Sequence, residues 1–79
     1  MAQRTTADET LPREELAAYL EELAAEFRSG DEEIDVRVGN KTVSLTPSEG
    51  VRTSVEVVER SPALRGNRET ITIELNWKS

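Results

Sequence analysis

The feature that most constrains the fold is a strict alternation of polar and apolar side chains over residues 70–77, within a final segment that begins at Glu69. One phase is apolar and consists of Ile71, Ile73, Leu75 and Trp77. Because successive side chains of a β-strand point to opposite faces, a period of two predicts a half-buried strand. The β-branched residues in both phases also favour a strand. We therefore expect this segment to belong to a sheet with one apolar and one polar face.

Two shorter runs, residues 33–38 and 41–46, are separated by a Gly-Asn dipeptide that is typical of two-residue hairpin turns. If the runs pair around this turn, Val36 lies opposite Val43 and Ile34 lies opposite Leu45. The same register matches the polar residues on the other face. A single register that satisfies both faces predicts a hairpin at this position.

A third strand is predicted for residues 51–60, after a turn-forming Pro-Ser-Glu-Gly segment. Three of its four valines occupy odd positions, as do the apolar residues of the second run, so only a loop of odd length brings both sets to one face. We expect a loop of five residues, which pairs Leu45 with Thr53 and Val43 with Val55.

The third and final strands are predicted to pair around a loop at residues 61–68, which contains a proline and a glycine. In this register Val55 lies opposite Ile73, and Val51 lies opposite Trp77. The phase of the final strand places Trp77 on the apolar face, so we expect it to anchor the core with Val51 and Phe27. The alternative is that the indole anchors a partner protein, as tryptophan often does at interfaces.

One amphipathic helix is predicted over residues 11–29, with Pro12 in its first turn and Gly30 as its left-handed stop. Its apolar positions recur at helical spacing and are Leu16, Tyr19, Leu20, Leu23 and Phe27. Residues 1–10 are polar without periodicity, and we expect a loose tail or a short edge strand there. The predicted fold is α+β, a single domain over residues 11–79 in which this long helix packs on a four-stranded antiparallel meander sheet.

Three motifs occur in this order: Arg-Glu-Glu-Leu-Ala at residues 13–17, the Gly-Asn hairpin, and Glu-Leu-Asn-Trp at residues 74–77. The chain resembles the Amphi-Trp domain in these motifs, over nearly its whole length from the helix onward. That family is small, prokaryotic and mostly haloarchaeal. The resemblance implies a fold with an amphipathic final strand and a halophilic setting, but no established activity, cofactor or catalytic residue. Lys78 and Ser79 stand where many members carry acids.

Several classes of chemistry are excluded by the residues that the chain lacks. It contains no cysteine and no histidine, which removes disulfides, thiolate metal sites and histidine-based catalysis. It also lacks a Gly-rich phosphate loop and a nucleophile elbow. Asp31, Glu32 and Glu33 follow the helix without calcium-loop spacing. We expect no enzymatic activity, no cofactor and no metal site, and, without a signal peptide or a run of ~18 apolar residues, a cytoplasmic protein without membrane contact.

The formal net charge of −6 is unevenly distributed: residues 1–33 carry ten acids and three bases, and residues 34–79 carry six acids and seven bases. We expect four bases to gather beside the helix N-terminus as a candidate anion-binding site, namely Lys41, Arg60, Arg65 and Arg68. The uncovered polar face and the unpaired edges of the sheet favour a different function. They predict an interaction module that binds another protein or a second copy of itself. A nucleic-acid or anion-binding accessory protein is the alternative.

Overall fold

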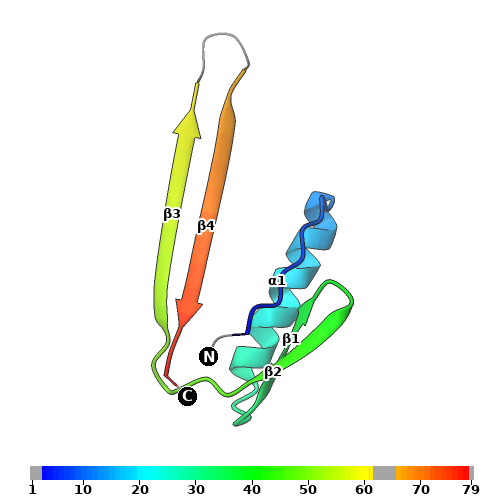
Figure 1. The fold of residues 1–79 in the computed structure, drawn as a ribbon, viewed down its shortest axis with the longest axis vertical. Helices are drawn as coiled ribbons and strands as arrows, with labels where there is room; N and C mark the ends of the chain where they lie inside the picture. Colours follow the sequence, from blue (N-terminus) through cyan, green and yellow to red (C-terminus); the bar gives the residue numbers. More distant parts are fainter. Residues whose placement is uncertain (1–2, 62–65, 79) are drawn as a thin grey trace. The chain divides into compact units, whose positions relative to one another are not determined.

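The computed structural model describes residues 3–61 and 66–78. The described residues form one helix and four strands, in the order α1–β1–β2–β3–β4 (Figure 1). The strands make two antiparallel hairpins, β1–β2 and β3–β4. The chain divides into two compact units, Met1–Thr46 and Pro47–Ser79, which we name unit 1 and unit 2. The α+β class predicted from the sequence is confirmed, and the single domain predicted for residues 11–79 remains a prediction.

The helix α1 spans Arg13–Arg28 and has 16 residues, so it is shorter than predicted at both ends. Pro12 occupies the N-cap with a ψ of 153°, an extended conformation that keeps it outside the first turn. Leu11 is constrained as well, because a residue before proline avoids the helical region. At the other end Gly30 has a φ of +76°, which glycine adopts without strain, and it stops the helix as predicted. No helix in the described part of the chain is long and apolar enough to cross a membrane.

In unit 1 the strands β1 (Ile34–Val38) and β2 (Lys41–Leu45) pair in the predicted register. Gly39 opens the turn between them with a φ of +61°. The helix α1 packs against β1. Ile34 is only 1% exposed, and no other side chain in the described residues is as deeply buried. The helical stripe is less well covered, because Leu16 and Leu20 are each 45% exposed.

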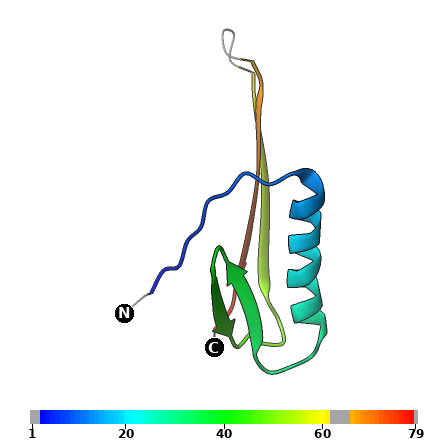
Figure 2. The same cartoon turned by 90° about the vertical axis from the view of Figure 1, so that its right-hand side faces the viewer.

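Residues 3–12 lead into α1 as an extended segment (Figure 2). Ala7 passes the turn of the first hairpin so closely that a β-carbon on Gly39 would lie 3.1 Å from the Ala7 Cβ. The segment has no strand pairing, so the alternative of an N-terminal edge strand is not realised in described residues 3–10.

Unit 2 consists of the strands β3 (Arg52–Arg60) and β4 (Arg68–Asn76), each nine residues long. Their register confirms the predicted pair of Val55 with Ile73, and it also pairs Val57 with Ile71. The ladder ends at the pair Arg52–Asn76, so the predicted partners Val51 and Trp77 lie one step beyond it. Both of these side chains are half-buried.

The predicted pairing of the second strand with the third is wrong. Residues 3–61 and 66–78 contain two separate two-stranded sheets and no four-stranded meander, so the pairs Leu45–Thr53 and Val43–Val55 do not form. The two hairpins that do form are each specified by alternation along their strands. The connection at residues 46–51 has no such determinant, and its Pro47 lacks an N–H and restricts the residue before it. Matching parity of apolar positions allows a pairing but does not by itself produce one.

Candidate functional site

Unit 2 presents a row of exposed aliphatic side chains, which we name the hairpin face: Val55, Val57, Ile71, Ile73 and Leu75. The register places all five on one side of the β3–β4 ribbon. Four of them are between 55% and 70% exposed. Unit 2 has no other helix or strand in its described residues, so no element of its own covers this face. Isolated two-stranded hairpins are only marginally stable in water, which makes a bare apolar face on one unusual.

The two ends of the hairpin face differ in character. At the end next to the 61–67 connection, Glu59 lies directly opposite Glu69 in the same phase as the aliphatic residues. At the other end Thr53 faces Leu75, and Trp77 continues the same phase. The face is therefore an aliphatic strip with two carboxylates at one end and an indole at the other.

The candidate anion-binding site is brought together only in part. Arg60 lies directly opposite Arg68 at the end of the β3–β4 ladder. Like charges in this position repel one another, so the pair destabilises the ladder there. Lys41 begins β2 in unit 1, and Arg65 falls outside the described residues. The four-residue site therefore remains a prediction.

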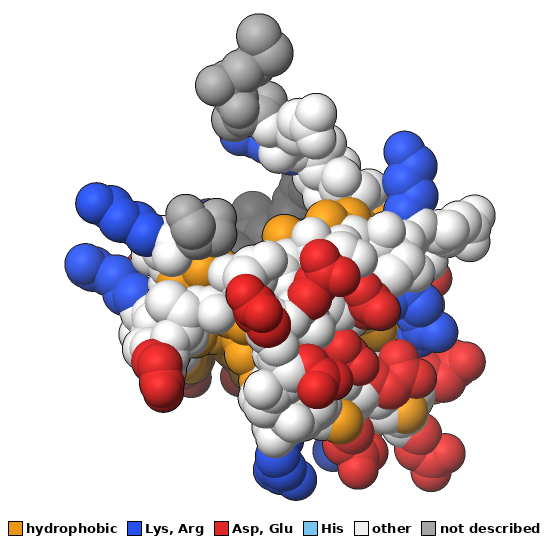
Figure 3. Space-filling view, turned by 90° about the horizontal axis from the view of Figure 1, so that it is seen from below, with side chains coloured by type: hydrophobic (Ala, Val, Ile, Leu, Met, Phe, Trp, Pro, Cys, Tyr) orange, Lys and Arg blue, Asp and Glu red, His pale blue; other side chains and the backbone are white. Residues whose placement is uncertain are grey.

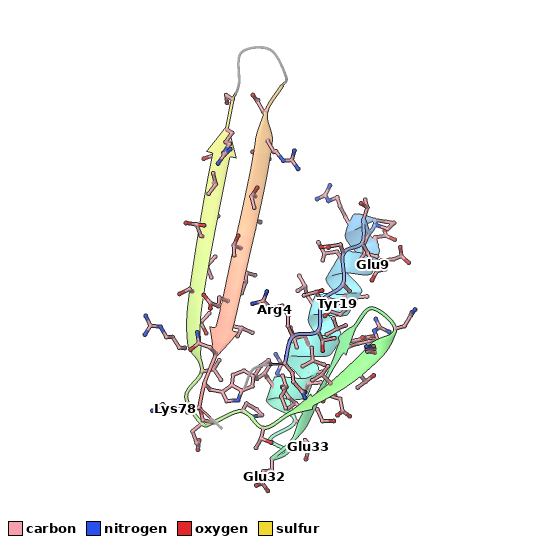
Figure 4. The ribbon with its side chains drawn as sticks, in the orientation of Figure 1. Arg4, Glu9, Tyr19, Glu32, Glu33 and Lys78 are labelled. Atoms are coloured by element: carbon pink, nitrogen blue, oxygen red, sulfur yellow. The ribbon has the colours of Figure 1, made fainter. Side chains whose placement is uncertain are left out.

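Unit 1 contains a polar junction that closes one edge of its sheet. The hydroxyl of Tyr19 donates to the carbonyl oxygen of Arg37 at 2.7 Å, and the backbone N–H of Asp35 donates to Oε1 of Glu26 at 2.8 Å. Tyr19 projects from the middle of α1, as Figure 4 shows. Because β1 pairs with β2 on one side only, these backbone groups belong to its other edge. Side chains of the helix thus engage two outward backbone groups of this edge, the N–H of Asp35 and the carbonyl of Arg37, and we name this the sealed edge.

The side chain of Arg37 joins the same junction. Its Nη2 lies 3.3 Å from Oε2 of Glu22, and its Cζ lies 5.9 Å from the centre of the Tyr19 ring. The two charged side chains are 57% and 60% exposed, so the ion pair contributes little to stability. The contact instead orients the guanidinium over the tyrosine ring.

The sequence analysis assigned the polar residues of the first hairpin to an uncovered face, and it missed the helix residues that meet Arg37. Tyr19, Glu22 and Glu26 recur at positions i, i+3 and i+7, which puts them along one side of α1. This spacing was the available signal. It was obscured because glutamates on a helix are normally solvated, whereas here one of them accepts a backbone hydrogen bond.

A shallow hollow lies between α1 and β1, but its polar groups are already engaged. It is lined by Tyr19, Glu22, Leu23, Ala25, Glu26, Asp35, Val36 and Arg37. Glu32 and Glu33 project from the connection between α1 and β1 (Figure 4), and acidic side chains gather on the face drawn in Figure 3. Among the described residues, no three acidic side chains converge in a way that could hold a metal ion. Because the polar groups that line the hollow already bond to one another, the hollow is a packing contact between α1 and β1.

The predicted anchor residues are distributed over both units. Phe27 lies on α1 in unit 1, while Val51 and Trp77 flank the open end of the β3–β4 ladder in unit 2. All three are half-buried. Their joint role in one core remains a prediction.

Comparison with known proteins identifies one family. The family model described as the Amphi-Trp domain matches residues 2–79, essentially the whole chain. This match confirms the resemblance carried by the helix start, the Gly-Asn turn and the Glu-Leu-Asn-Trp end. No curated protein and no solved structure matches the chain.

Proposed function

The chain belongs to the Amphi-Trp domain family, and we propose that it is a non-enzymatic interaction module that binds a partner protein through the hairpin face. The observation that carries this proposal is the exposure of the aliphatic strip, where Ile71 is 70% exposed and Val55 is 64% exposed. Contiguous apolar surface of this kind is rare on proteins that act alone, and it commonly marks a binding site.

The hairpin face can drive binding because burying its aliphatic side chains against a partner lowers the free energy. Each Å² of apolar surface removed from water contributes ~25 cal/mol, and branched side chains that are already ordered in a strand lose little further entropy. The charged residues beside the strip indicate which surface a partner should present. Glu59 and Glu69 close one end of the strip, so the partner should present an apolar surface with a basic group beside that end.

Photocrosslinking from adjacent positions tests the proposal. A photoreactive amino acid at position 71 lies on the hairpin face, whereas the same group at position 70 lies on the opposite face of the ribbon. We expect position 71 to crosslink a partner in native lysate and position 70 to leave it uncaptured. Equal capture from both positions, or crosslinks from position 71 that stay within one chain, would overturn the proposal.

A pair of charge variants then measures the affinity for the captured partner. Ile71→Lys places an ammonium in the aliphatic strip, and Thr70→Lys places the same group on the other face. We expect Ile71→Lys to weaken binding at least tenfold, which corresponds to about 1.4 kcal/mol, while Thr70→Lys binds like the wild type. Circular dichroism verifies that both variants are folded.

One observation favours the alternative, an anion-binding or nucleic-acid-binding accessory protein. The directly opposed Arg60 and Arg68 would be relieved of their repulsion by a bound phosphate. In that case RNA binding should weaken steeply with salt, and Arg60→Ala combined with Arg68→Ala should flatten the salt dependence. No binding at low salt by the folded protein would end this alternative.

A further inference from the structure

The two outer edges of the sheet in unit 1 are treated differently. The outer edge of β1 is sealed, because Glu26 accepts from the N–H of Asp35 and Tyr19 donates to the carbonyl of Arg37. The outer edge of β2 has no comparable cover in the described residues, where no backbone hydrogen bond leads to it from another strand or from α1. An open strand edge is a template for pairing with another chain.

The register identifies the groups on the open edge. Along an antiparallel ladder, the N–H and C=O groups of successive residues point alternately toward the partner strand and away from it. Asp35 and Arg37 point away from β2, as their bonds to α1 show. Their cross-strand partners are Ser44 and Thr42. The outward N–H and C=O groups of Thr42 and Ser44 are therefore the pairing sites of the open edge.

We propose that β2 of a second copy of this chain occupies the open edge, antiparallel, with the twofold axis at Val43. In this register Thr42 lies opposite Ser44 of the other copy, and Ser44 lies opposite its Thr42. Each pair exchanges two N–H···O bonds, so all outward groups of both strands are satisfied. The inference is independent of the proposed function, because it uses backbone groups of unit 1 and no residue of the hairpin face.

Three properties favour a second copy as the occupant. First, the outward residues are spaced i and i+2, so the edge is complementary to itself in an antiparallel arrangement. Second, Lys41 is the only charged residue of β2, and in this register it faces Leu45 of the other copy rather than a like charge. Third, the combined sheet ends on both sides in β1, where side chains of α1 already engage the N–H of Asp35 and the carbonyl of Arg37 in each copy. The assembly therefore closes at two chains and does not extend into a fibre.

Disulfide trapping tests the register directly, because the natural chain contains no cysteine. In the proposed dimer the two copies of residue 43 form a non-hydrogen-bonded pair with Cα atoms ~4.5 Å apart, within the range that a disulfide bridges. We expect Val43→Cys in the full chain to crosslink quantitatively on oxidation. In Lys41→Cys the two thiols lie four residues out of register, on the order of 13 Å apart, and should stay unlinked.

Light scattering on the full chain over a dilution series provides the second measurement. The wild type should have twice the 8.8 kDa mass of one chain at high concentration and dissociate on dilution. Thr42→Pro removes an outward N–H without touching the bonds between β1 and β2, so it should be monomeric at every concentration. Thr42→Val keeps the N–H and should remain dimeric.

Several results would overturn the inference. These are a wild type that stays monomeric at all concentrations, crosslinking of Lys41→Cys as efficient as that of Val43→Cys, and a folded Thr42→Pro variant that still dimerises. If circular dichroism shows that Thr42→Pro does not fold, the comparison of Val43→Cys with Lys41→Cys alone tests the proposed register. A dimer that is lost in Ile71→Lys but retained in Thr42→Pro would assign self-association to the hairpin face instead, and would refute the pairing through β2.

Discussion

Unit 1 and unit 2 are built on the same motif, an antiparallel hairpin with alternating side chains, yet their apolar residues have opposite exposure. In unit 1 the strands are five residues long, and Ile34 is 1% exposed. In unit 2 the strands are nine residues long, and Ile71 is 70% exposed. The longer ladder has more cross-strand pairs, but none of the described side chains of unit 2 is fully buried. In this chain, the length of a strand ladder therefore does not determine how far its apolar side chains are buried.

The helix α1 accounts in two ways for the difference in exposure between the two hairpins. It covers part of the apolar side of β1, and it also supplies Tyr19 and Glu26 as partners for backbone groups at the strand edge. Because Asp35 and Arg37 are exposed, water could replace these partners, so each bond contributes only about 0.5–1.5 kcal/mol. Unit 1 has both kinds of support within its own residues, whereas the described residues of unit 2 contain no helix.

The largest expected effect comes from the best-buried residue. Ile34→Ala should lower the free energy of unfolding by about 2–5 kcal/mol, because it removes a buried side chain and leaves a cavity. Leu45→Ala is the matched control, since Leu45 is the cross-strand partner of Ile34 but is 36% exposed. Urea denaturation followed by circular dichroism measures both. Equal losses in the two variants would contradict the assignment of the core to Ile34.

Trp77→Ala should have the next largest effect, about 2 kcal/mol, less than the cost of truncating a fully buried tryptophan because this side chain is half-buried. Trp77 is the only tryptophan, so its fluorescence reports on this end of unit 2 without ambiguity. Emission shifted to the blue and quenched poorly by acrylamide agrees with an anchor role beside Val51. Red, readily quenched emission from the folded protein would make Trp77 part of the exposed binding surface.

The sealed edge should contribute less than either side chain. Tyr19→Phe removes one hydrogen bond to an exposed strand edge, so we expect a loss of about 1 kcal/mol or less. Glu26→Ala should accelerate hydrogen exchange of the Asp35 amide in particular, because that N–H loses its acceptor. Glu22→Gln is the control, since its ion pair with Arg37 is exposed and should be worth less than ~0.5 kcal/mol. Unchanged exchange at Asp35 in Glu26→Ala would mean that the edge is not sealed by this contact.

These differences also explain how much could be predicted from the sequence. The β1–β2 register followed from the Gly-Asn turn at residues 39–40, and the β3–β4 register followed from the phase shared by Val55 and Ile73. Both are local properties, readable from period and turn chemistry. The pairing of Val43 with Val55 was predicted from parity alone, and it does not form.

The sealed edge could not be predicted for a different reason. A glutamate such as Glu26 has the same appearance in the sequence whether it is solvated or accepts from a strand N–H. Only the crossing of α1 over β1 decides between the two, and that crossing depends on tertiary packing. The hairpin face was predicted as the inner side of a sheet, and its side chains are in phase as expected. Their spacing does not determine whether another element of the chain covers them.

The smallest expected effect tests the difference in exposure between unit 1 and unit 2 most directly. Ile71→Ala should change the free energy of unfolding by no more than ~0.5 kcal/mol, since most of this side chain already contacts water and truncating it opens no cavity. Thr72→Ala, on the other face of the same strand, should have a similarly small effect. Denaturation at protein concentrations low enough to prevent association is the measurement. A loss above about 2 kcal/mol in Ile71→Ala, but not in Thr72→Ala, would mean that the hairpin face is buried in the single chain. The contrast between the units would then disappear, and the apolar phase of the final strand would belong to a core shared with the rest of the chain, not to a binding surface.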